Sequence, residues 1–371
     1  MLRCFKVKNF KGFKDWISLD LESQNNYAFN TDCIKDTLVK TALLYGYNGS
    51  GKSNIGLAIF DIVSHLTDKR TDKSLYQNFQ NGHDSEGLVE FIYTFQFGDT
   101  ILEYQYGKEN VDSIVYEKLY IQNEEIVFFD KRNNDSEFIS RLSGTENLNK
   151  AIKELRISVI KYIKSNSVLE SNSENTMFYA FTDFVDKMLM FWALDTKSYI
   201  GYENDSGDII QDIIKNDRVK DFKTFLEDFK LDNNILVKEI GGKKNFLYEF
   251  EDYQINFYQA ASTGVRSLTL FYYWYERMRT NKSRPSFIFI DEFDAFYHSD
   301  ISELIISLLK KLDIQVILTT HNSNLMSNDL LRPDCCFLVS KNEIAPFSKR
   351  VEKELRLAHN IEKMYRAGAF E

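Results

Sequence analysis

The segment Gly46-Tyr47-Asn48-Gly49-Ser50-Gly51-Lys52-Ser53 constrains the fold of this chain more than any other. It follows an apolar run, 39–45, that predicts a buried strand, and it precedes apolar residues at helical spacing over 55–63. A glycine-rich connection between a strand and a helix lets backbone N–H groups turn toward a ligand beside the positive helix end. We therefore expect an α/β fold built around this loop.

The same segment matches the pattern G-x-x-x-x-G-K-[ST], in which the loop holds the phosphates of a nucleotide. Lys52 is expected to reach the β- and γ-phosphates, and the Ser53 hydroxyl is expected to coordinate Mg²⁺. The predicted cofactors are accordingly ATP and Mg²⁺. The predicted nucleotide-binding residues of the loop are Asn48, Gly49, Ser50, Gly51, Lys52 and Ser53.

Two further apolar runs, 286–290 and 314–318, are each followed at once by polar residues, as in central strands of a mostly parallel sheet. Asp291 after the first run is expected to join Ser53 at the metal. Glu292 beside it is placed to orient and deprotonate the attacking water. His321 after the second run is expected to hydrogen-bond the γ-phosphate. The predicted catalytic residues are Glu292 and His321.

A fourth segment, Ser262-Thr263-Gly264-Val265-Arg266, precedes a predicted helix over 268–278. A serine hydroxyl, a glycine amide and a helix N-terminus together can cradle a second phosphate face, which assigns Ser262 and Gly264 to nucleotide binding. Taken alone, the same residues would indicate no more than a helix N-cap.

The order of these four segments resembles the ABC ATPase class, in the branch that holds SMC-like proteins and OLD-type ATPases. In that class Ser262 and Gly264 stand in the signature motif, and Asp294 stands in the D-loop as a further nucleotide contact. Thr263 and Val265 differ from the commoner glycine and glutamine. Candidates for the Q-loop glutamine are Gln77, Gln80 and Gln96, and none of them is singled out.

Softer patterns are similar to stand-alone bacterial phage-defence ATPases of the AbiL, RloA and PARIS AriA type. They are the start at 10–13, the Phe/Tyr-rich stretch 91–129 and the ending His359–Gly368. The resemblance implies an ABC-type P-loop NTPase with a mixed or parallel central sheet, an antiparallel β meander and a helical insertion. We expect ATPase lobe I over 1–135, the helical insertion over 136–232 and ATPase lobe II over 233–371. Helices are predicted over 147–164, 177–194 and 219–229.

The net charge and the cysteines bear on possible ligands and on the cellular compartment. A formal net charge of −9 and a pI near 5.3 mean that nucleic-acid binding would need a local basic patch. The cysteines show no C-x-x-C spacing, the charged start is unlike a signal peptide, and no apolar run of 18 residues occurs. We expect a cytoplasmic protein without a membrane span.

The resemblance implies Mg²⁺-dependent ATP hydrolysis by an ATPase that acts as sensor or scaffold in antiphage defence. ATP would be sandwiched between two copies of the chain, giving a homodimer or higher oligomer. The partner would be a separately encoded effector, a TOPRIM- or HNH-like nuclease. Alternatives left open are an SMC-like DNA-repair or DNA-tethering ATPase with a basic face at Lys6, Lys8, Lys11 and Lys14, a transporter subunit, and a non-hydrolysing scaffold.

Overall fold

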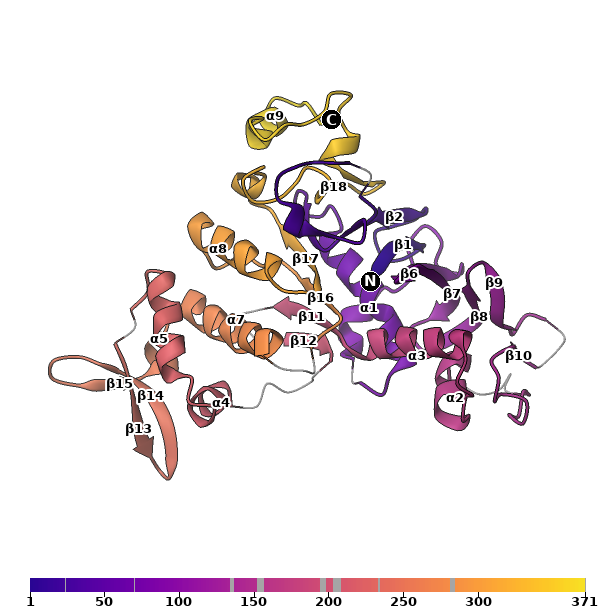
Figure 1. Cartoon of the computed structure of the whole chain (residues 1–371), viewed down its shortest axis with the longest axis horizontal. Coiled ribbons are helices and arrows are strands. Elements are labelled where there is room, and N and C mark those ends of the chain that lie inside the picture. The colour runs from indigo at the N-terminus through magenta and orange to yellow at the C-terminus, as the bar shows by residue number, and fades with distance from the viewer. Residues whose placement is uncertain are drawn as a thin grey trace.

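Two seven-stranded sheets and the helices around them make up most of the described chain (Figure 1). The computed structural model describes residues 1–23, 25–69, 71–133, 137–151, 157–193, 198–202, 208–232, 234–280 and 284–370. None of the helices in these ranges is long and apolar enough to cross a membrane.

The central sheet is mostly parallel. Its strand order is β12 (Ser198–Gly201), β11 (Met188–Ala193), β16 (Phe287–Ile290), β17 (Gln315–Thr320), β5 (Thr41–Tyr45), β18 (Cys336–Val339) and β19 (Ile344–Pro346). The five inner strands run parallel, and both edge strands are antiparallel. Every residue of β5, β16 and β17 is buried. Burial on both faces explains why these strands are nearly continuous apolar runs.

Helices cover both faces of this sheet. A Cβ added to Gly56 of α1 (Lys52–Leu66) would lie 2.8 Å from Met190 Cε, so α1 packs closely on that face of β11. The next residue along β11, Phe191, points to the opposite face, where its ring lies 5.7 Å from that of Trp274 in α7 (Thr263–Thr280). Helices α1 and α7 therefore lie on opposite sides of the sheet.

The second sheet is antiparallel. Its order is β10 (Ile139–Ser140), β9 (Glu124–Asp130), β8 (Ser113–Ile121), β7 (Thr100–Asn110), β6 (Val89–Phe97), β1 (Leu2–Lys8) and β2 (Ile17–Asp20). Strands β6 to β9 form the meander predicted from the sequence, and this prediction is confirmed. Tyr93 of β6 donates its hydroxyl to Ala58 O of α1 at 2.8 Å, so α1 lies between the two sheets.

The remaining elements are shorter or peripheral. The other helices are α2 (Val159–Asn166), α3 (Ser173–Asp186), α4 (Ile209–Lys215), α5 (Val219–Asp228), α6 (Phe257–Ala260), α8 (Ser299–Lys310) and α9 (Ile361–Arg366). A small sheet of β13 (Ile235–Ile240), β14 (Lys243–Glu249) and β15 (Gln254–Asn256) projects beyond α5, and β3 (Ile34–Lys35) pairs with β4 (Leu38–Val39) (Figure 1). Short 3₁₀ turns occupy Thr31–Cys33, Lys73–Tyr76, Ser323–Leu325 and Phe347–Lys349.

Two of the three helices predicted for the middle of the chain need correction. The helix predicted over 177–194 is wrong beyond Asp186, because Met188–Ala193 is strand β11, paired in parallel with β16; Leu194 lies outside the described residues. Of the helix predicted over 147–164, only the part from Val159 onward is helical among the described residues, and 152–156 lie outside them. The third helix, α5, is confirmed.

An apolar run that is buried on both faces looks the same whether it is a strand or a buried helix, and this explains the error at β11. The segment 136–232, predicted as a helical insertion, contributes helices α2 to α5 and also strands β11 and β12 of the central sheet. Its boundaries as a separate unit stay a prediction.

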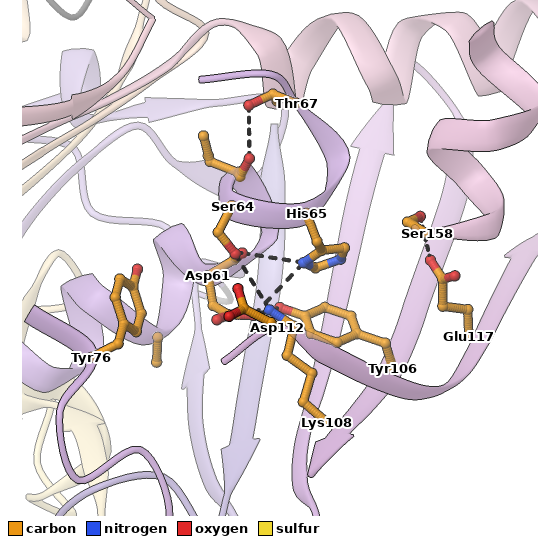
Figure 2. Close-up of polar contacts among 12 residues, drawn as sticks. Asp61, Ser64, His65, Thr67, Tyr76, Tyr106, Lys108, Asp112, Glu117 and Ser158 are labelled. Atoms are coloured by element: carbon orange, nitrogen blue, oxygen red, sulfur yellow. Dashed lines mark hydrogen bonds and ion pairs between the residues drawn. The ribbon is translucent and has the colours of Figure 1, made fainter. Parts of the chain in front are cut away.

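A buried ion pair fastens α1 to the antiparallel sheet. Lys108 Nζ of β7 lies 2.7 Å from Asp61 Oδ2 of α1, and both side chains are fully buried. The Tyr106 hydroxyl donates to the same carboxylate oxygen at 2.8 Å, and Figure 2 shows these side chains converging. Among the described residues Asp61 Oδ1 has no hydrogen-bond partner. The position of α1 therefore depends on a charge pair that water cannot reach.

Asp61→Ala leaves the Lys108 ammonium buried and unpaired, so we expect the free energy of unfolding to fall by about 3–5 kcal/mol in urea denaturation. The double variant Asp61→Leu, Lys108→Met should recover most of that loss, because no charge is then buried. As a control, Lys73→Met removes an exposed pair with Asp112 and should cost less than about 1 kcal/mol. A double variant no more stable than Asp61→Ala would contradict this account.

Candidate functional site

The carboxyl ends of β5, β16 and β17 meet at one edge of the central sheet. Their register pairs Ile290 with Leu318 and Thr320 with Tyr45, so the residues that follow the three strands emerge side by side. A pocket of about 200 Å³ lies there. It is lined by Asn48, Gly49, Gly51, Lys52, Ser53, Asn54, Glu292 and His321. Residues almost 270 positions apart in the chain, such as Lys52 and His321, thus share one pocket.

The glycine-rich loop has the backbone conformation that its sequence requires. Gly49 (φ 77°) and Gly51 (φ 102°) both lie in the left-handed region, which costs glycine nothing. A Cβ on Gly51 would also lie 2.7 Å from the ring of Phe13, so this position has no room for a side chain. Ser50 Oγ is buried without a hydrogen-bond partner among the described residues. The loop is tightly packed on the side that faces Phe13, and it opens toward the pocket.

Lys52, the first residue of α1, turns its ammonium back over the loop. Its Nζ donates to Gly46 O at 2.7 Å and to Tyr47 O at 3.3 Å, and it lies 3.0 Å from His321 Nδ1. Burial lowers the pKa of Lys52, and the nearby carboxylates Asp291, Glu292 and Asp294 oppose this effect. The pocket therefore holds a partly desolvated cation whose partners are carbonyl groups and a ring nitrogen, a setting that favours an anionic ligand.

Asp291, directly after β16, lies behind the pocket rather than in its lining. Thr319 Oγ1 donates to Asp291 Oδ1 at 2.7 Å and accepts the Glu292 N–H at 2.7 Å. Burial raises the pKa of Asp291, whereas hydrogen bonds from Thr319 and Ser53 oppose that rise. The contact brings together the carboxylate and the hydroxyl predicted to bind the metal. Oxygen ligands of this kind are those that Mg²⁺ prefers.

Glu292 is held in a strained backbone conformation. Its φ of 44° lies in the left-handed region, which is costly for a residue with a Cβ. Residues strained in this way cluster at functional sites. The carboxylate is half-exposed at the pocket, with Oε1 3.0 Å from His321 Nε2. His321 Nδ1 in turn lies 2.9 Å from Gly46 O. One imidazole therefore connects the carboxylate after β16 to the start of the phosphate loop.

Asp294 lies next to the pocket without lining it. Thr320 Oγ1 donates to Asp294 Oδ2 at 2.8 Å and accepts the Asn322 N–H at 2.9 Å. Burial raises the pKa of Asp294. Thr319 and Thr320 thus each fix one of the predicted acidic residues, a role that the sequence reasoning did not assign to them. Two threonines directly after a central strand are the signal that could have indicated it.

The structure keeps Ser262 and Gly264 apart from this pocket. Neither residue lines it, and Ser262 is exposed at the start of α7. Ser262 Oγ accepts the Val265 N–H at 3.3 Å, as a helix cap does. A Cβ on Gly264 would lie 3.0 Å from Phe296 O, so the start of α7 abuts the segment after Asp294. Within one chain the two halves of the predicted nucleotide site do not meet.

None of the Q-loop candidates lines the pocket either. Gln96 accepts from Arg3 at 3.2 Å, and Gln80 donates to Glu109 O. Gln77 caps the 3₁₀ turn Lys73–Tyr76. The position of a metal-contacting glutamine stays open.

The C-terminal helix α9 touches the phosphate loop, a contact that the sequence did not indicate. The ring of Tyr365 lies 5.1 Å from that of Tyr45 at the end of β5 and 6.4 Å from that of Tyr47. Tyr47 itself is 69% exposed. The rim of the loop therefore packs partly against Tyr365, an aromatic side chain from the far end of the sequence.

The fold and the site define the class of this protein: it is an α/β P-loop ATPase. Residues 42–327 match the family described as "AAA domain, putative AbiEii toxin, Type IV TA system", and the chain belongs to that family. No curated protein matches the sequence.

Similar solved structures include the SMC head domain from Thermotoga maritima, at 14% identity and a TM-score of 0.42, covering 93% of this chain and 98% of that one. An SMC head bound to the C-terminal winged-helix domain of ScpA has 14% identity, a TM-score of 0.44 and coverage of 94% and 99%. The recombination mediator RecF with ATP has 12% identity, a TM-score of 0.39 and coverage of 93% and 99%.

Gly51→Ala places a methyl group against Phe13 and forces alanine to a φ of 102°, so the loop must change shape. We expect nucleotide affinity, measured by titration with a fluorescent ATP analogue, to fall at least about 10-fold, which corresponds to about 1.4 kcal/mol. Gly82→Ala is the control, because a Cβ there meets nothing within 4 Å. Equal affinity of the two variants would show that the loop tolerates the methyl group.

Proposed function

We propose that this protein binds Mg·ATP at the pocket beside the phosphate loop and hydrolyses it. The observation that carries the proposal is the convergence of Lys52, Ser53, Asp291, Glu292 and His321 at one edge of a parallel sheet. Membership of an ATPase family supports it. One pocket brings together a buried cation, two oxygen ligands suited to a metal, and a carboxylate beside a histidine. Chance would be a poor explanation of this grouping.

Each residue would have a distinct part. The Lys52 ammonium would exchange its carbonyl partners for phosphate oxygens, and the backbone of residues 48–53 would surround the β-phosphate. Ser53 and Asp291 would hold Mg²⁺, which supplies positive charge against the triphosphate. Glu292 would take the proton of the attacking water as general base, oriented by its 3.0 Å contact with His321.

A second copy of the chain would complete the site. A pocket of about 200 Å³ is smaller than the roughly 300–1,000 Å³ of ordinary small-molecule sites, so one chain cannot enclose a nucleoside triphosphate. Ser262 and Gly264 lie exposed or half-buried at a helix start, free to face such a ligand from another protomer. Asp294, just behind the pocket, would lie at the same junction. We therefore propose an ATP-sandwiched homodimer, with higher assembly on the same interface.

In the cell, we propose that the ATPase is the sensor or scaffold of a cytoplasmic antiphage system. The family description names a toxin of a type IV toxin–antitoxin system, which supports a role in defence. The effector would be a separately encoded TOPRIM- or HNH-like nuclease, recognised in part by the segment 136–232 between the two ATPase lobes.

The DNA-tethering alternative depends on a basic face, and the contacts of its lysines weaken this alternative. Lys8 lies 3.5 Å from Glu90, and Lys11 Nζ donates to Gln77 O at 2.7 Å. Two of its four lysines are thus already engaged within the chain. Strong stimulation of ATP hydrolysis by DNA, with a steep loss on adding salt, would favour this alternative instead.

Glu292→Gln should still bind Mg·ATP but lose hydrolysis by about 10²–10⁴-fold, because an amide cannot accept the proton of the attacking water. Phosphate release and size-exclusion chromatography in ATP measure the two effects, and we expect the variant to accumulate as a closed dimer. Lys52→Ala, in contrast, should lose nucleotide binding itself. Hydrolysis by Glu292→Gln at the wild-type rate would exclude this residue as the base.

Mixing two inactive variants tests whether the site is shared between copies. Lys52→Ala removes the phosphate loop's cation, and Ser262→Arg blocks the opposing face. A mixed dimer has one intact composite site, so an equimolar mixture should recover about a quarter of wild-type activity if the dimer is symmetric and the sites are independent. The control is each variant mixed with itself. No recovery in a mixture that demonstrably forms mixed dimers would contradict a shared site.

A further inference from the structure

A second pocket lies at the opposite end of α1 from the phosphate loop. It has a volume of about 660 Å³, within the range of small-molecule sites. We call it the α1-end pocket, and it is formed by the last turn of α1, the 3₁₀ turn Lys73–Tyr76, the β7–β8 connection and the start of α2. Its lining includes Ser64, His65, Lys69, Thr71, Lys73 and Lys161. Figure 2 shows this region, with Ser64 and His65 at the end of α1.

One wall of the α1-end pocket has polar atoms without partners. Lys69 Nζ and Thr71 Oγ1 are both buried, and neither has a hydrogen-bond partner among the described residues. Lys69 contacts the Tyr202 ring, with Nζ 5.5 Å from its centre, but a ring face accepts no conventional hydrogen bond. Because a buried cation without an acceptor is costly, such a group needs an explanation, and a bound anion would supply one.

The charge around the pocket favours an anion. Three lysines line it, against the one carboxylate of Asp112 among the described residues. Asp112 is paired with Lys73 at 2.7 Å, on the exposed rim. Lys161 lies 2.6 Å from Asp68, a side chain that is 96% exposed and so largely screened by water. Lys69 forms no salt bridge with a described residue, and the charge of Asp186 offsets only part of the effect of its burial.

The floor of the α1-end pocket, in contrast, is already satisfied. His65 Nε2 lies 3.0 Å from the Tyr104 hydroxyl, which donates to Glu117 at 2.6 Å, and Ser158 donates to the same carboxylate at 2.6 Å. Burial and the charge of Lys108 hold the pKa of His65 well below its usual range, so the ring is neutral at pH 7. Among the described residues, the free donors of the pocket are thus confined to the wall with Lys69 and Thr71.

The rest of the lining is apolar. Val111, Ile114 and Ile157 contribute aliphatic surface, and the Tyr76 ring is buried, with its hydroxyl donating to Leu57 O of α1. A small inorganic anion would leave this surface wet. A ligand with an anionic head and an apolar body would match both parts of the pocket.

We propose that the α1-end pocket binds a phosphate monoester with an apolar body, whose phosphate contacts Lys69 and Thr71 and whose body lies against Val111 and Ile114. Lysine is a common phosphate partner, and a dianionic head suits a site with several cations around it. The site is separate from the ATP pocket and uses none of its residues. A ligand here would contact the end of the helix whose first residue is Lys52.

Site-resolved acylation tests the proposal with phenyl phosphate as the probe. Burial lowers the pKa of Lys69 to about 8, so near pH 8 much of this amine is deprotonated and reacts with an acetylating reagent. Peptide mass spectrometry then reports the rate at each lysine. The chain carries Lys52→Ala, which removes the phosphate loop's cation and with it that loop's contribution.

At saturating phenyl phosphate, acylation of Lys69 should slow by about threefold or more, whereas acylation of Lys35, outside the pocket and paired with Asp313, should not change. Inorganic phosphate should need a higher concentration for the same protection, and phenol should give none. Equal rates at Lys69 with and without phenyl phosphate, or equal protection by phenol, would overturn the proposal.

Thermal unfolding of the same Lys52→Ala chain gives a second readout. Phenyl phosphate should raise the unfolding temperature, because a ligand that binds only the folded state stabilises it. Adding Lys69→Gln should remove at least about half of that rise, whereas adding Lys35→Gln should leave it intact. Equal rises in the two variants would show that any binding lies elsewhere, and the proposal would fail whether or not the protein hydrolyses ATP.

Discussion

The parallel pairing of β5, β16 and β17 is the constraint on which the site depends. Main-chain hydrogen bonds fix the register of three strands that are far apart in sequence, so their carboxyl ends lie at the same level of the sheet. Thr319, at the end of β17, then bridges Asp291 and the Glu292 backbone after β16. A slip of one residue would reverse the faces of these side chains and remove the bridge. The chemistry thus follows from the pairing.

Helix α1 connects the site to the rest of the molecule through its contacts with both sheets. It carries Lys52 at its first residue, packs through Gly56 on the central sheet and is tied by Asp61 to Lys108 of the antiparallel sheet. A buried pair contributes little net stability, but it strongly penalises arrangements in which one partner loses the other. The helix is therefore held at one position between two sheets, with the phosphate loop at one end and the α1-end pocket at the other.

Much of the candidate site could be predicted from local sequence. Glycines at 49 and 51, Lys52, and polar residues directly after mostly apolar runs each have a physical reason that a single segment reveals. Strand β11 could not be recognised, because an apolar run buried on both faces does not show a hydrophobic period that separates a strand from a helix. The α1-end pocket could not be predicted either, since its residues come from α1, the 3₁₀ turn Lys73–Tyr76, the β7–β8 connection, β8 and α2 and share no spacing. Threonine bridges and pockets between elements depend on tertiary contacts, which local patterns do not encode.

The small volume of the nucleotide pocket bears on how such a protein could act as a switch. One chain offers the phosphate loop but no cover, and the exposed start of α7, proposed to contact phosphate from a second chain, lies outside the pocket. A ligand that needs both surfaces binds the paired state far more tightly than the single chain, and only such a difference in affinity can shift an association equilibrium. Removing the γ-phosphate contacts would reduce that difference. An incomplete pocket in one chain is therefore what ATP-controlled pairing requires, whereas a fully enclosed site would let nucleotide bind without any effect on assembly.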